Sequence, residues 1–587
     1  MQMKKLRRLI RVPELYLGLL LVLFGIWSSS DNVIGKNISL TRDGKTKNTA
    51  FPIMENMAKG EQFSVSFDVS ASDGNYDLHI IPDDCIQEIV VNGLVVPLDG
   101  INGLCNYSSG FFLHHEQFRG TGKDHFEFEL TNSGGPGGLN VEISHPLASS
   151  HFVVSVIFWV LFCVLCACIL RRFRVPAVPL VILICGIALR IAFTESLPSP
   201  SKFGHDVDGH VAYVQYIVEN GSLPAAEDCW TCYHPPVYFT AVAPAWKFAH
   251  VLNLTGDTAL QLVSLFLSFA ILLMGFFVLQ KWLNGTALNI ATLLWAFWPV
   301  MIISSSRIGN DQLFYLFHIV CLWGSAMYAK CRSGKHLLVA AVASLLAIWT
   351  KSTGAISVGV CVLGFLLGYF GPVGWVKLKK SEIVAAVVIL VTIVGYLVHM
   401  MTGDGSLVAN AHSLHGGLKV GKSWVNFLYV DLQQMIAHPF VNAWDDELGR
   451  QYFWNYMMKT SLFGEFVLLK RGAGVVFAEI VNISFLVLVV YCIRGFWKKD
   501  ISRRSLLFTA QFLAFVLALA FLRYKHPFSC SNDFRYIAPV LLSVIPFMSM
   551  GITAPGSSTK ARALGITVAV VFAICSVVTM FFVMGSF

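Results

Sequence analysis

Apolar segments recur along this chain of 587 residues at lengths that match the thickness of a bilayer. A transmembrane helix needs about 20 mainly apolar residues. Charged residues make up only 13% of the chain and mean hydropathy is +0.63, which excludes a water-soluble globular protein. The windows lie near residues 13–30, 151–170, 177–195, 259–280, 287–305, 312–330, 336–350, 354–370, 382–402, 473–494, 505–522, 536–553 and 564–584. The sequence therefore predicts a polytopic α-helical membrane protein with about thirteen transmembrane helices.

Basic residues gather in loops that share one side of the membrane if every window spans it. They precede the first window and follow the second, sixth, eighth and tenth, as at Arg171, Lys330, Lys377 and Arg494. Loops rich in Lys and Arg face the cytoplasm. These loops account for most of the net charge of +8, so no nucleic-acid partner is predicted. We expect an integral protein of the cell (inner) membrane with its N-terminus inside.

Residues 31–148 differ from the rest of the chain because they are polar and alternate with period two. The runs 63–69 and 126–130 place an apolar residue at every second position, which is typical of half-buried strands. Asn92-Gly93 between two apolar runs indicates a hairpin turn. We predict an extracytoplasmic β-sandwich, jelly-roll-like, held by a disulfide between Cys85 and Cys105.

These features divide the chain in sequence order. The predicted parts are an uncleaved N-terminal anchor (1–30), the β-sandwich domain (31–148), a second anchor helix (149–175), a catalytic transmembrane module (176–402) with its first external loop at 196–258, a long external loop (403–471) and C-terminal transmembrane helices (472–587).

The stretch 204–239 is polar and acidic and lies between apolar windows. Asp206 and His210 are four residues apart, so they share a face if this segment is helical. Apolar residues at helical spacing across 207–218 predict an amphipathic helix on the membrane surface. Carboxylates, a His and aromatic side chains at that depth make a candidate reaction site. The alternative is an external loop in which Asp residues only cap a helix.

Two cysteines in the same stretch form a Cys-x-x-Cys pair. Cys229 and Cys232 could bind a metal ion together with a neighbouring His. A disulfide, within the pair or to Cys530, is the favoured interpretation. No metal site and no cofactor are predicted, and the sequence leaves a divalent cation open.

An outward window with Arg190 near its end is followed by five motifs. They are Asp206-x-x-x-His210-x-x-Tyr213, His234-Pro-Pro-Val-Tyr238, Arg307-Ile-Gly-Asn310-Asp311, Lys351-Ser-Thr-Gly and Asp533-Phe-Arg535-Tyr536-x-x-Pro539. Together these stretches resemble those of the GT-C glycosyltransferases, especially relatives of the protein O-mannosyltransferases and of the lipid A aminoarabinose transferase. The resemblance covers about 177–585. It departs from the family where the first-loop acidic pair is spread as Asp206-Val-Asp208, and where His234 replaces the Lys of the aminoarabinose transferases, so the donor sugar is not implied.

The resemblance implies a GT-C fold and an inverting transfer of a sugar from a polyprenyl phosphate. The acceptor would be a glycolipid, polysaccharide or protein of the cell envelope, and the site would face the extracytoplasmic side. An acceptor hydroxyl needs a general base, and the departing lipid phosphate needs cationic or N–H donors. Membrane lipid and the two substrates are the predicted partners.

The resemblance also suggests a role for each candidate residue. Asp206 is the predicted base, with Asp208 as a substitute base, a metal-site partner or a helix cap. His210 would orient the base or bind the acceptor. Donor phosphate would be bound by Arg190, His234, Lys351 and Arg535, and acceptor or supporting contacts would come from Tyr213, Tyr238, Arg307, Asn310 and Asp311. Each cation could instead extend to the interface from the end of a span, and Asn310 and Asp311 could cap a helix.

Two other kinds of protein remain open from the sequence. An oligosaccharide ligase or polymerase of related fold would use similar motifs. A non-enzymatic transporter would be expected to carry inverted repeats and ionisable groups near the middle of the bilayer. The ionisable groups of this chain gather at one face instead, which favours chemistry at the membrane surface.

Overall fold

The computed structural model describes most of the chain. The described residues are 32–49, 51, 53–71, 76–98, 101, 104–105, 110–118, 123–133, 136–144, 150–197, 204–249, 251, 254–370, 378–402, 416–465, 473–497 and 503–584. The predicted first window, 13–30, lies outside them. The chain divides into two compact units, one running up to Leu165 and the other from Cys166 onward.

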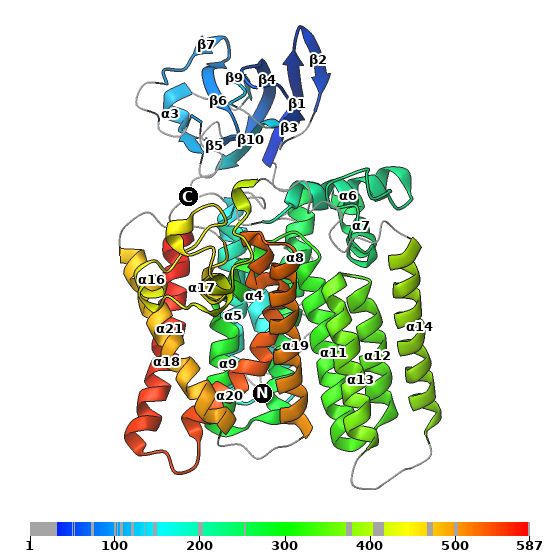
Figure 1. Ribbon diagram of the computed structural model, residues 1–587. Coiled ribbons are helices and arrows are strands. Elements are labelled where there is room, and N and C mark those ends of the chain that lie inside the picture. Colours follow the sequence, from blue (N-terminus) through cyan, green and yellow to red (C-terminus); the bar gives the residue numbers. More distant parts are fainter. Residues whose placement is uncertain are drawn as a thin grey trace, which may run out of the picture. The chain divides into compact units, whose positions relative to one another are not determined.

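The first unit contains two antiparallel sheets (Figure 1). The six-stranded sheet has the order β2-β1-β4-β9-β6-β7, with β1 (Asn32–Arg42), β2 (Lys45–Asn48), β4 (Gln62–Ala71), β6 (Cys85–Val91), β7 (Leu94–Val95) and β9 (Lys123–Thr131). The four-stranded sheet has the order β3-β10-β5-β8, with β3 (Ile53–Asn56), β5 (Asp77–Pro82), β8 (Phe111–Leu113) and β10 (Pro136–Ser144). A single turn of helix, α3 (His115–Phe118), follows β8.

The alternating sequence pattern explains how these sheets form a core. Side chains at every second position of β4 are buried, including Phe63, Val65 and Phe67, and they join residues of the smaller sheet such as Ile80 in one hydrophobic cluster. The expected hairpin is present, because Val91 of β6 pairs with Leu94 of β7 across a two-residue turn. Both turn residues have positive φ, as such a turn requires. Cys85 and Cys105 form a disulfide in this unit.

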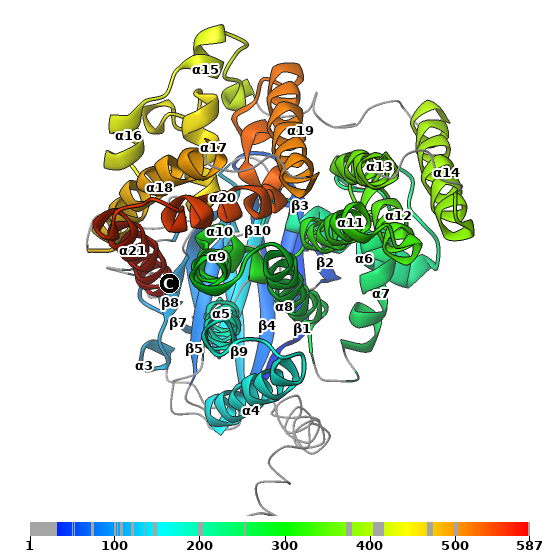
Figure 2. The ribbon, with the colours of Figure 1, turned by 90° about the horizontal axis from the view of Figure 1, so that it is seen from below.

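The second unit is a helical bundle. Its long helices are α5 (Ala177–Glu195), α8 (Gly256–Trp282), α9 (Gly285–Phe297), α11 (Asp311–Cys331), α12 (Gly334–Ile348), α13 (Ala355–Tyr369), α14 (Lys380–Thr402), α18 (Ala473–Trp497), α19 (Arg503–Lys525), α20 (Leu541–Thr553) and α21 (Thr559–Met584). Figure 2 looks along the helix axes and shows most of them as separate coils. The helix α4 (Ser150–Arg172) precedes them and includes the division between the units.

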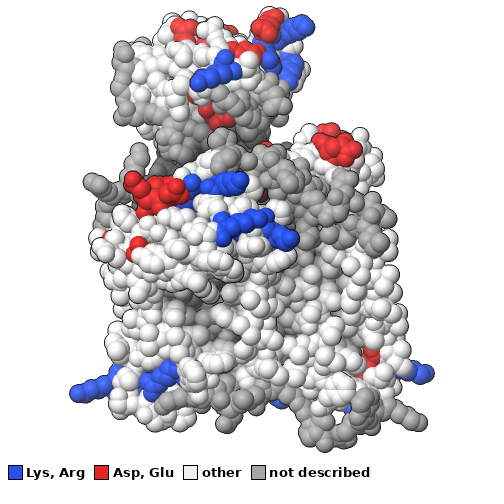
Figure 3. Space-filling model, viewed as in Figure 1, with Lys and Arg blue, Asp and Glu red and all other residues white. Residues whose placement is uncertain are grey.

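The bundle has the composition of a membrane protein. Within the described ranges, nine helices are long and apolar enough to cross a bilayer, or ten if the bent pair 285–297 and 299–306 counts as one span. The bend of 53° falls where Pro299 starts a new helical segment, α10 (Pro299–Ile303), because proline cannot continue the preceding ladder of hydrogen bonds. In Figure 3, Lys, Arg, Asp and Glu are concentrated toward the two ends of the bundle, with a band of uncharged surface between them. The protein is thus a polytopic helical membrane protein.

Two further predicted windows within the described residues are helical but fall outside that set. One corresponds to α4, and another to α12, which has 15 residues and is therefore short for a span. Short elements connect the bundle at the end that carries α6 (Val207–Asn220) and α7 (Val237–Ala249) in Figure 1. They are η2 (Ser304–Ser306), η3 (Ser352–Gly354), η5 (Gly416–Leu418), α15 (Trp424–Leu428), α16 (Leu432–Ala437), η6 (Asp446–Leu448), α17 (Phe453–Phe463), η7 (Ser529–Asn532) and η8 (Phe534–Val540).

Candidate functional site

The helix α6 lies where the sequence pattern predicted an amphipathic helix. It runs from Val207 to Asn220 and is followed by Gly221, whose φ of 66° is the left-handed conformation that often closes a helix. Its apolar face packs on α7, with the ring of Tyr213 stacked on Phe239 at a centroid distance of 3.9 Å. Tyr213 also donates a 3.4 Å hydrogen bond to the carbonyl of His234. This packing fixes the start of α6 against the second half of the loop.

Asp206 immediately precedes α6 in a conformation that is unusual for a residue with a side chain. Its φ is 55° and its ψ is 32°, and its carboxylate makes no capping hydrogen bond to the helix. The carboxylate instead approaches two side chains: Nη2 of Arg535 is 3.7 Å from Oδ2, and Nε1 of Trp230 donates to Oδ1 at 3.4 Å. The capping alternative is therefore not what the geometry shows. A left-handed backbone here costs about 1–3 kcal/mol and persists only where its surroundings enforce it.

Arg535 lies at the centre of an ion-pair network. Its guanidinium is within 3.9 Å of Asp311 Oδ2 and within 3.3 Å of Asp533 Oδ2, in addition to Asp206. Asp311, the first residue of α11, also pairs with Lys351 just before η3. The ring of Tyr536 lies 4.9 Å from Lys351 Nζ and 5.0 Å from Arg535 Cζ. Residues far apart in the sequence thus form one network of cations and carboxylates.

A second group of titratable side chains adjoins this network. His205 lies 3.4 Å from Glu465 and 3.5 Å from Asp533, and the hydroxyl of Tyr456 donates to Glu465 at 2.6 Å. Burial, reinforced by the negative charge of Asp533, raises the pKa of Glu465 to about 8. Burial, with Arg535 close by, lowers the pKa of His205 well below its usual value. At neutral pH this group therefore holds a protonated Glu465 and a neutral His205.

The same three side chains have donor atoms within 4.8 Å of one another, a spacing that a metal ion could bridge. Arg535 Nε already lies 3.3 Å from the Asp533 carboxylate. Burial raises the pKa of Glu465, and metal ligation requires a deprotonated carboxylate. A divalent cation here would therefore compete with the Arg535 guanidinium for Asp533 and with a proton for Glu465.

A small cavity opens beside the network. Its walls are formed by His205, His210, Ser304, Arg307, Ile308, Gly309, Asp311, Gln312, Tyr315 and Arg535. His210 is only 4% exposed, and burial lowers its pKa to about 4. Its ring rests against Gly309, where an added Cβ would come within 3.2 Å of it. The neutral imidazole of His210 and the side chains of Arg307 and Arg535 therefore line the same cavity.

Solved structures similar to this chain are membrane glycosyltransferases. Aminoarabinose transferase ArnT from Cupriavidus metallidurans, bound to undecaprenyl phosphate, is 12% identical with a TM-score of 0.42, over 69% of this chain and 76% of ArnT. Oligosaccharyltransferase AglB from Archaeoglobus fulgidus, in complex with an inhibitory peptide and a dolichol phosphate, is 12% identical with a TM-score of 0.40, over 69% and 55%. Arabinosyltransferase EmbB from Mycobacterium smegmatis is 12% identical with a TM-score of 0.29, over 95% and 65%.

All three are members of the GT-C superfamily, the group that the motifs resemble. No protein-family model and no curated protein matches the sequence.

The structure brings together some of the predicted residues and separates others. Asp206, His210, Arg307, Asp311, Lys351 and Arg535 belong to the cavity or its ion-pair network. Asp208 is exposed in the first turn of α6. Arg190 is buried in the bundle, where it donates to Ser268 at 3.0 Å and to the carbonyls of Gly186 and Ala296. This placement gives Arg190 a role in joining α5 to α8 and α9 rather than in binding phosphate.

The remaining predicted residues support the site. The imidazole of His234 stacks on His210 at 5.8 Å, and burial, with Lys351 and Arg535 close by, lowers the pKa of His234. The hydroxyl of Tyr238 accepts a hydrogen bond from the backbone of Gly309 at 3.1 Å. Asn310 donates to the carbonyl of Thr350 at 3.3 Å and makes no capping hydrogen bond. The last two contacts hold the segment between η2 and α11 against Tyr238 of α7 and against Thr350.

Several contributing residues were not among the predicted site residues, including His205, Trp230, Asp533 and Glu465. His205 and Trp230 lie in the stretch 204–239, but no role was predicted for either. Asp533 belongs to the motif Asp533-Phe-Arg535-Tyr536, so the sequence already placed it beside Arg535. Glu465 follows α17 in a segment of ordinary composition, and no sequence signal marks it.

Proposed function

We propose that this protein is an inverting glycosyltransferase that moves a hexose or pentose from a polyprenyl phosphate to a hydroxyl group of a cell-envelope acceptor. The observation that carries the proposal is the position of the Asp206 carboxylate. It is 41% exposed, and it lies 3.7 Å from Arg535 in a network that also holds Lys351. A base that can reach substrate thus stands beside two cations.

Asp206 is the best placed of the acidic residues to act as the base. The acceptor hydroxyl must lose its proton as the new bond forms, and an accessible carboxylate can take it. Asp311 is less suited, because it is paired with both Lys351 and Arg535 and its side chain is only 21% exposed. Asp533 is fully buried. Asp208, although exposed, lies on the first turn of α6, beyond the network.

The cations beside Asp206 suit the other half of the reaction. The leaving group is a lipid phosphate, whose charge is stabilised by guanidinium, ammonium or N–H donors. Arg307 and Arg535 line the cavity, and Lys351 is joined to it through Asp311. A phosphate bound at this place would compete with the carboxylates for these cations. We therefore assign donor phosphate binding to Arg307, Lys351 and Arg535.

The place of the site in the bundle agrees with a lipid-linked donor. Asp311 and Lys351 stand at the ends of apolar helices, and Asp206 precedes the amphipathic α6. Such residues lie at the depth of lipid head groups. We propose that this end of the bundle faces the extracytoplasmic side of the inner membrane, as the basic loops at the other end imply. We also propose that residues 31–148 form an extracytoplasmic β-sandwich.

The decisive experiment uses purified protein in liposomes with a polyprenyl phosphate that carries a radiolabelled sugar. Label should pass to an extract of envelope acceptors, and a sugar nucleotide should not replace the lipid donor. Protein carrying Asp206→Asn serves as the negative control. Transfer from the sugar nucleotide alone, or equal transfer by the Asp206→Asn protein, would contradict the proposal. Movement of the lipid or sugar across the liposome without transfer would favour a transporter instead.

A further inference from the structure

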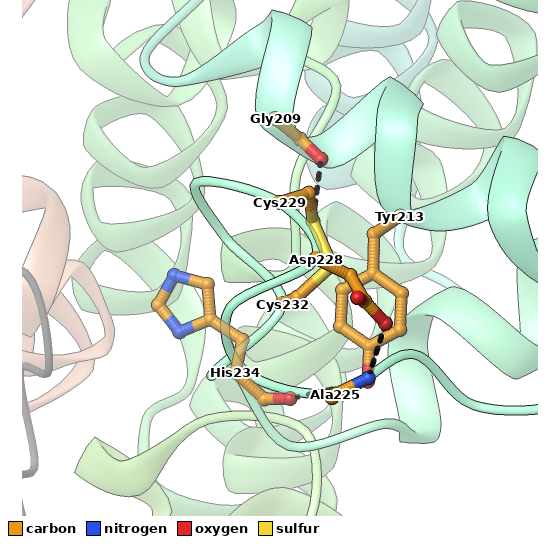
Figure 4. The surroundings of a disulfide bond; sticks show 7 residues. All are labelled: Gly209, Tyr213, Ala225, Asp228, Cys229, Cys232 and His234. Carbon is orange, nitrogen blue, oxygen red and sulfur yellow. Dashed lines mark hydrogen bonds between the residues drawn. A yellow bond between two sulfur atoms is a disulfide. The ribbon is translucent and has the colours of Figure 1, made fainter.

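The Cys229–Cys232 disulfide lies beside the start of α6 (Figure 4). It closes the short loop Cys229-Trp230-Thr231-Cys232 on itself, and Cys232 belongs to the hydrophobic core formed by α6 and α7. The backbone carbonyl of Gly209 lies 4.0 Å from the Cys229 sulfur. The loop is therefore anchored on both sides, by a covalent bond and by the core.

Gly209 permits this close approach. A Cβ added at Gly209 would come within 2.6 Å of the methyl group of Thr231 and within 3.2 Å of the Trp230 ring. Thr231 is only 1% exposed and is β-branched, so it has little room to move. The first turn of α6 and the disulfide loop are thus packed in direct contact, one turn after Asp206.

The loop directs Trp230 at the proposed base. Nε1 of Trp230 donates to Oδ1 of Asp206 at 3.4 Å, while Arg535 approaches the other oxygen, Oδ2. Two donors on opposite oxygens restrict the rotation of a carboxylate that would otherwise be free, since Asp206 makes no capping bond. Trp230 is 39% exposed. The closed loop constrains the backbone from which the indole extends.

We propose that Trp230 is a positioning residue for Asp206, and that the Cys229–Cys232 disulfide is the clasp that keeps its indole in place. This inference rests on the proposed function, because it assigns Asp206 as the base. Restricting the carboxylate fixes the lone pair that accepts the hydroxyl proton, and misplacement of a catalytic group lowers the rate steeply. Donor binding depends on other side chains, so it should be indifferent to Trp230.

The first test compares Trp230→Phe with the exposed Trp424→Phe, which is 73% exposed in the wild type. Trp230→Phe should lower kcat about 5- to 50-fold with the donor KM unchanged, and Trp424→Phe should leave both unchanged. In an Asp206→Asn background, Trp230→Phe should cause no further loss. An equal loss in both backgrounds would overturn the proposal, because it would show that Trp230 acts independently of Asp206.

The second test opens the disulfide in folded protein. A phosphine reductant converts it to two thiols, and water supplies the oxygen of the phosphine oxide and the two protons. Reduction should lower kcat of the wild type to the level of Trp230→Phe and leave Trp230→Phe itself unaffected. Protein with Cys85→Ser and Cys105→Ser should remain sensitive, since its only change is in the other disulfide. Undiminished kcat with both thiols shown free by mass spectrometry would overturn the role of the clasp.

A third readout does not depend on activity and separates this inference from the proposed function. Coupling of an amine to Asp206 by a water-soluble carbodiimide, measured by peptide mass spectrometry, should increase severalfold in Trp230→Phe and on reduction. Labelling of Asp208 should stay constant. Increased labelling in a protein that transfers no sugar would support the positioning contact and reject the function. Unchanged labelling of Asp206 would reject the contact, whatever the activity.

Discussion

The two ends of α11 carry similar side chains that have different roles. At its C-terminal end, Glu382 is fully buried and accepts hydrogen bonds from Tyr328 at 2.7 Å and from the backbone of Lys379 at 2.8 Å, with Arg332 at 3.3 Å. At its N-terminal end, Asp311 joins a network in which Asp206 stays 41% exposed, and its side-chain partners among the described residues lie at 3.4 and 3.7 Å. Both ends combine carboxylates, cations and a tyrosine.

The difference is one of saturation. Glu382 has short donors on both oxygens, so a new ligand would have to break existing bonds, and the arrangement serves to join α11 to α14. In the other network, Asp206 has longer contacts, at 3.4 and 3.7 Å. That network also borders a cavity. Buried polar groups are normally satisfied, and departures from that rule mark places where a substrate can complete the set.

The largest effect is expected at Asp206. Asp206→Asn keeps the side-chain size, and Asn tolerates the left-handed backbone that Asp206 adopts, so the protein should fold and bind donor normally. Transfer should fall by about 10²- to 10⁴-fold, because the base is lost. Asp208→Asn is the matched control and should retain most activity. Labelled-sugar transfer by both variants measures this, and a dead Asp208→Asn beside an active Asp206→Asn would exchange their roles.

Glu382→Gln should have the reverse profile. It removes the charge that faces Arg332 while keeping the shape, so the free energy of unfolding should fall by about 1–3 kcal/mol. The kcat of the folded fraction should not change. Thermal unfolding in detergent, together with the transfer assay, tests both statements. A fall in kcat without a fall in stability would mean that the saturated end also takes part in catalysis.

The pH dependence of stability should report the buried Glu465 carboxyl group at the site. The pKa of Glu465 is about 8 in the folded protein against an ordinary value of 4.5, so the folded state binds one proton more than the unfolded state between these values. The free energy of unfolding should therefore decrease as pH rises from about 4.5 to about 8, by at most about 1.4 kcal/mol per pH unit. Glu465→Gln, which resembles the protonated form, should remove this slope. Unfolding temperatures measured across that range would contradict the prediction if both proteins showed the same slope.

The smallest effect is expected from removal of metal ions. Arg535 already faces Asp533, and Glu465 is protonated at neutral pH, so the His205 group should not require a cation. Treatment with EDTA should leave kcat within about twofold of the untreated enzyme, and Mg²⁺, Mn²⁺ or Ca²⁺ should not raise it. A loss that one of these cations restores would show that the group binds a metal ion despite the neighbouring guanidinium.

The periodic and local features of this protein were readable in its sequence. Apolar windows predicted α5, α8, α11 and α18 to within a few residues, because hydrocarbon imposes a minimum length on a helix that crosses it. Period-two alternation predicted the strands around Phe63–Val69, and Asn92-Gly93 predicted the hairpin. The first external loop was recognisable from the spacing of Asp206 and His210. Each of these signals lies within one short segment.

What the tertiary structure alone decided is which charged side chains meet. Arg190 and Arg535 occupy similar settings in the sequence, yet Arg190 donates to carbonyls inside the bundle and Arg535 reaches Asp206. Glu465, just after α17, joins His205, just before α6, across more than two hundred residues, and only the tertiary fold brings these two segments together. Side-chain periodicity reports the environment of one helix, whereas a pair of charges depends on how separate helices pack. For that reason the sequence located the reaction site on the chain, and the fold selected the residues that form it.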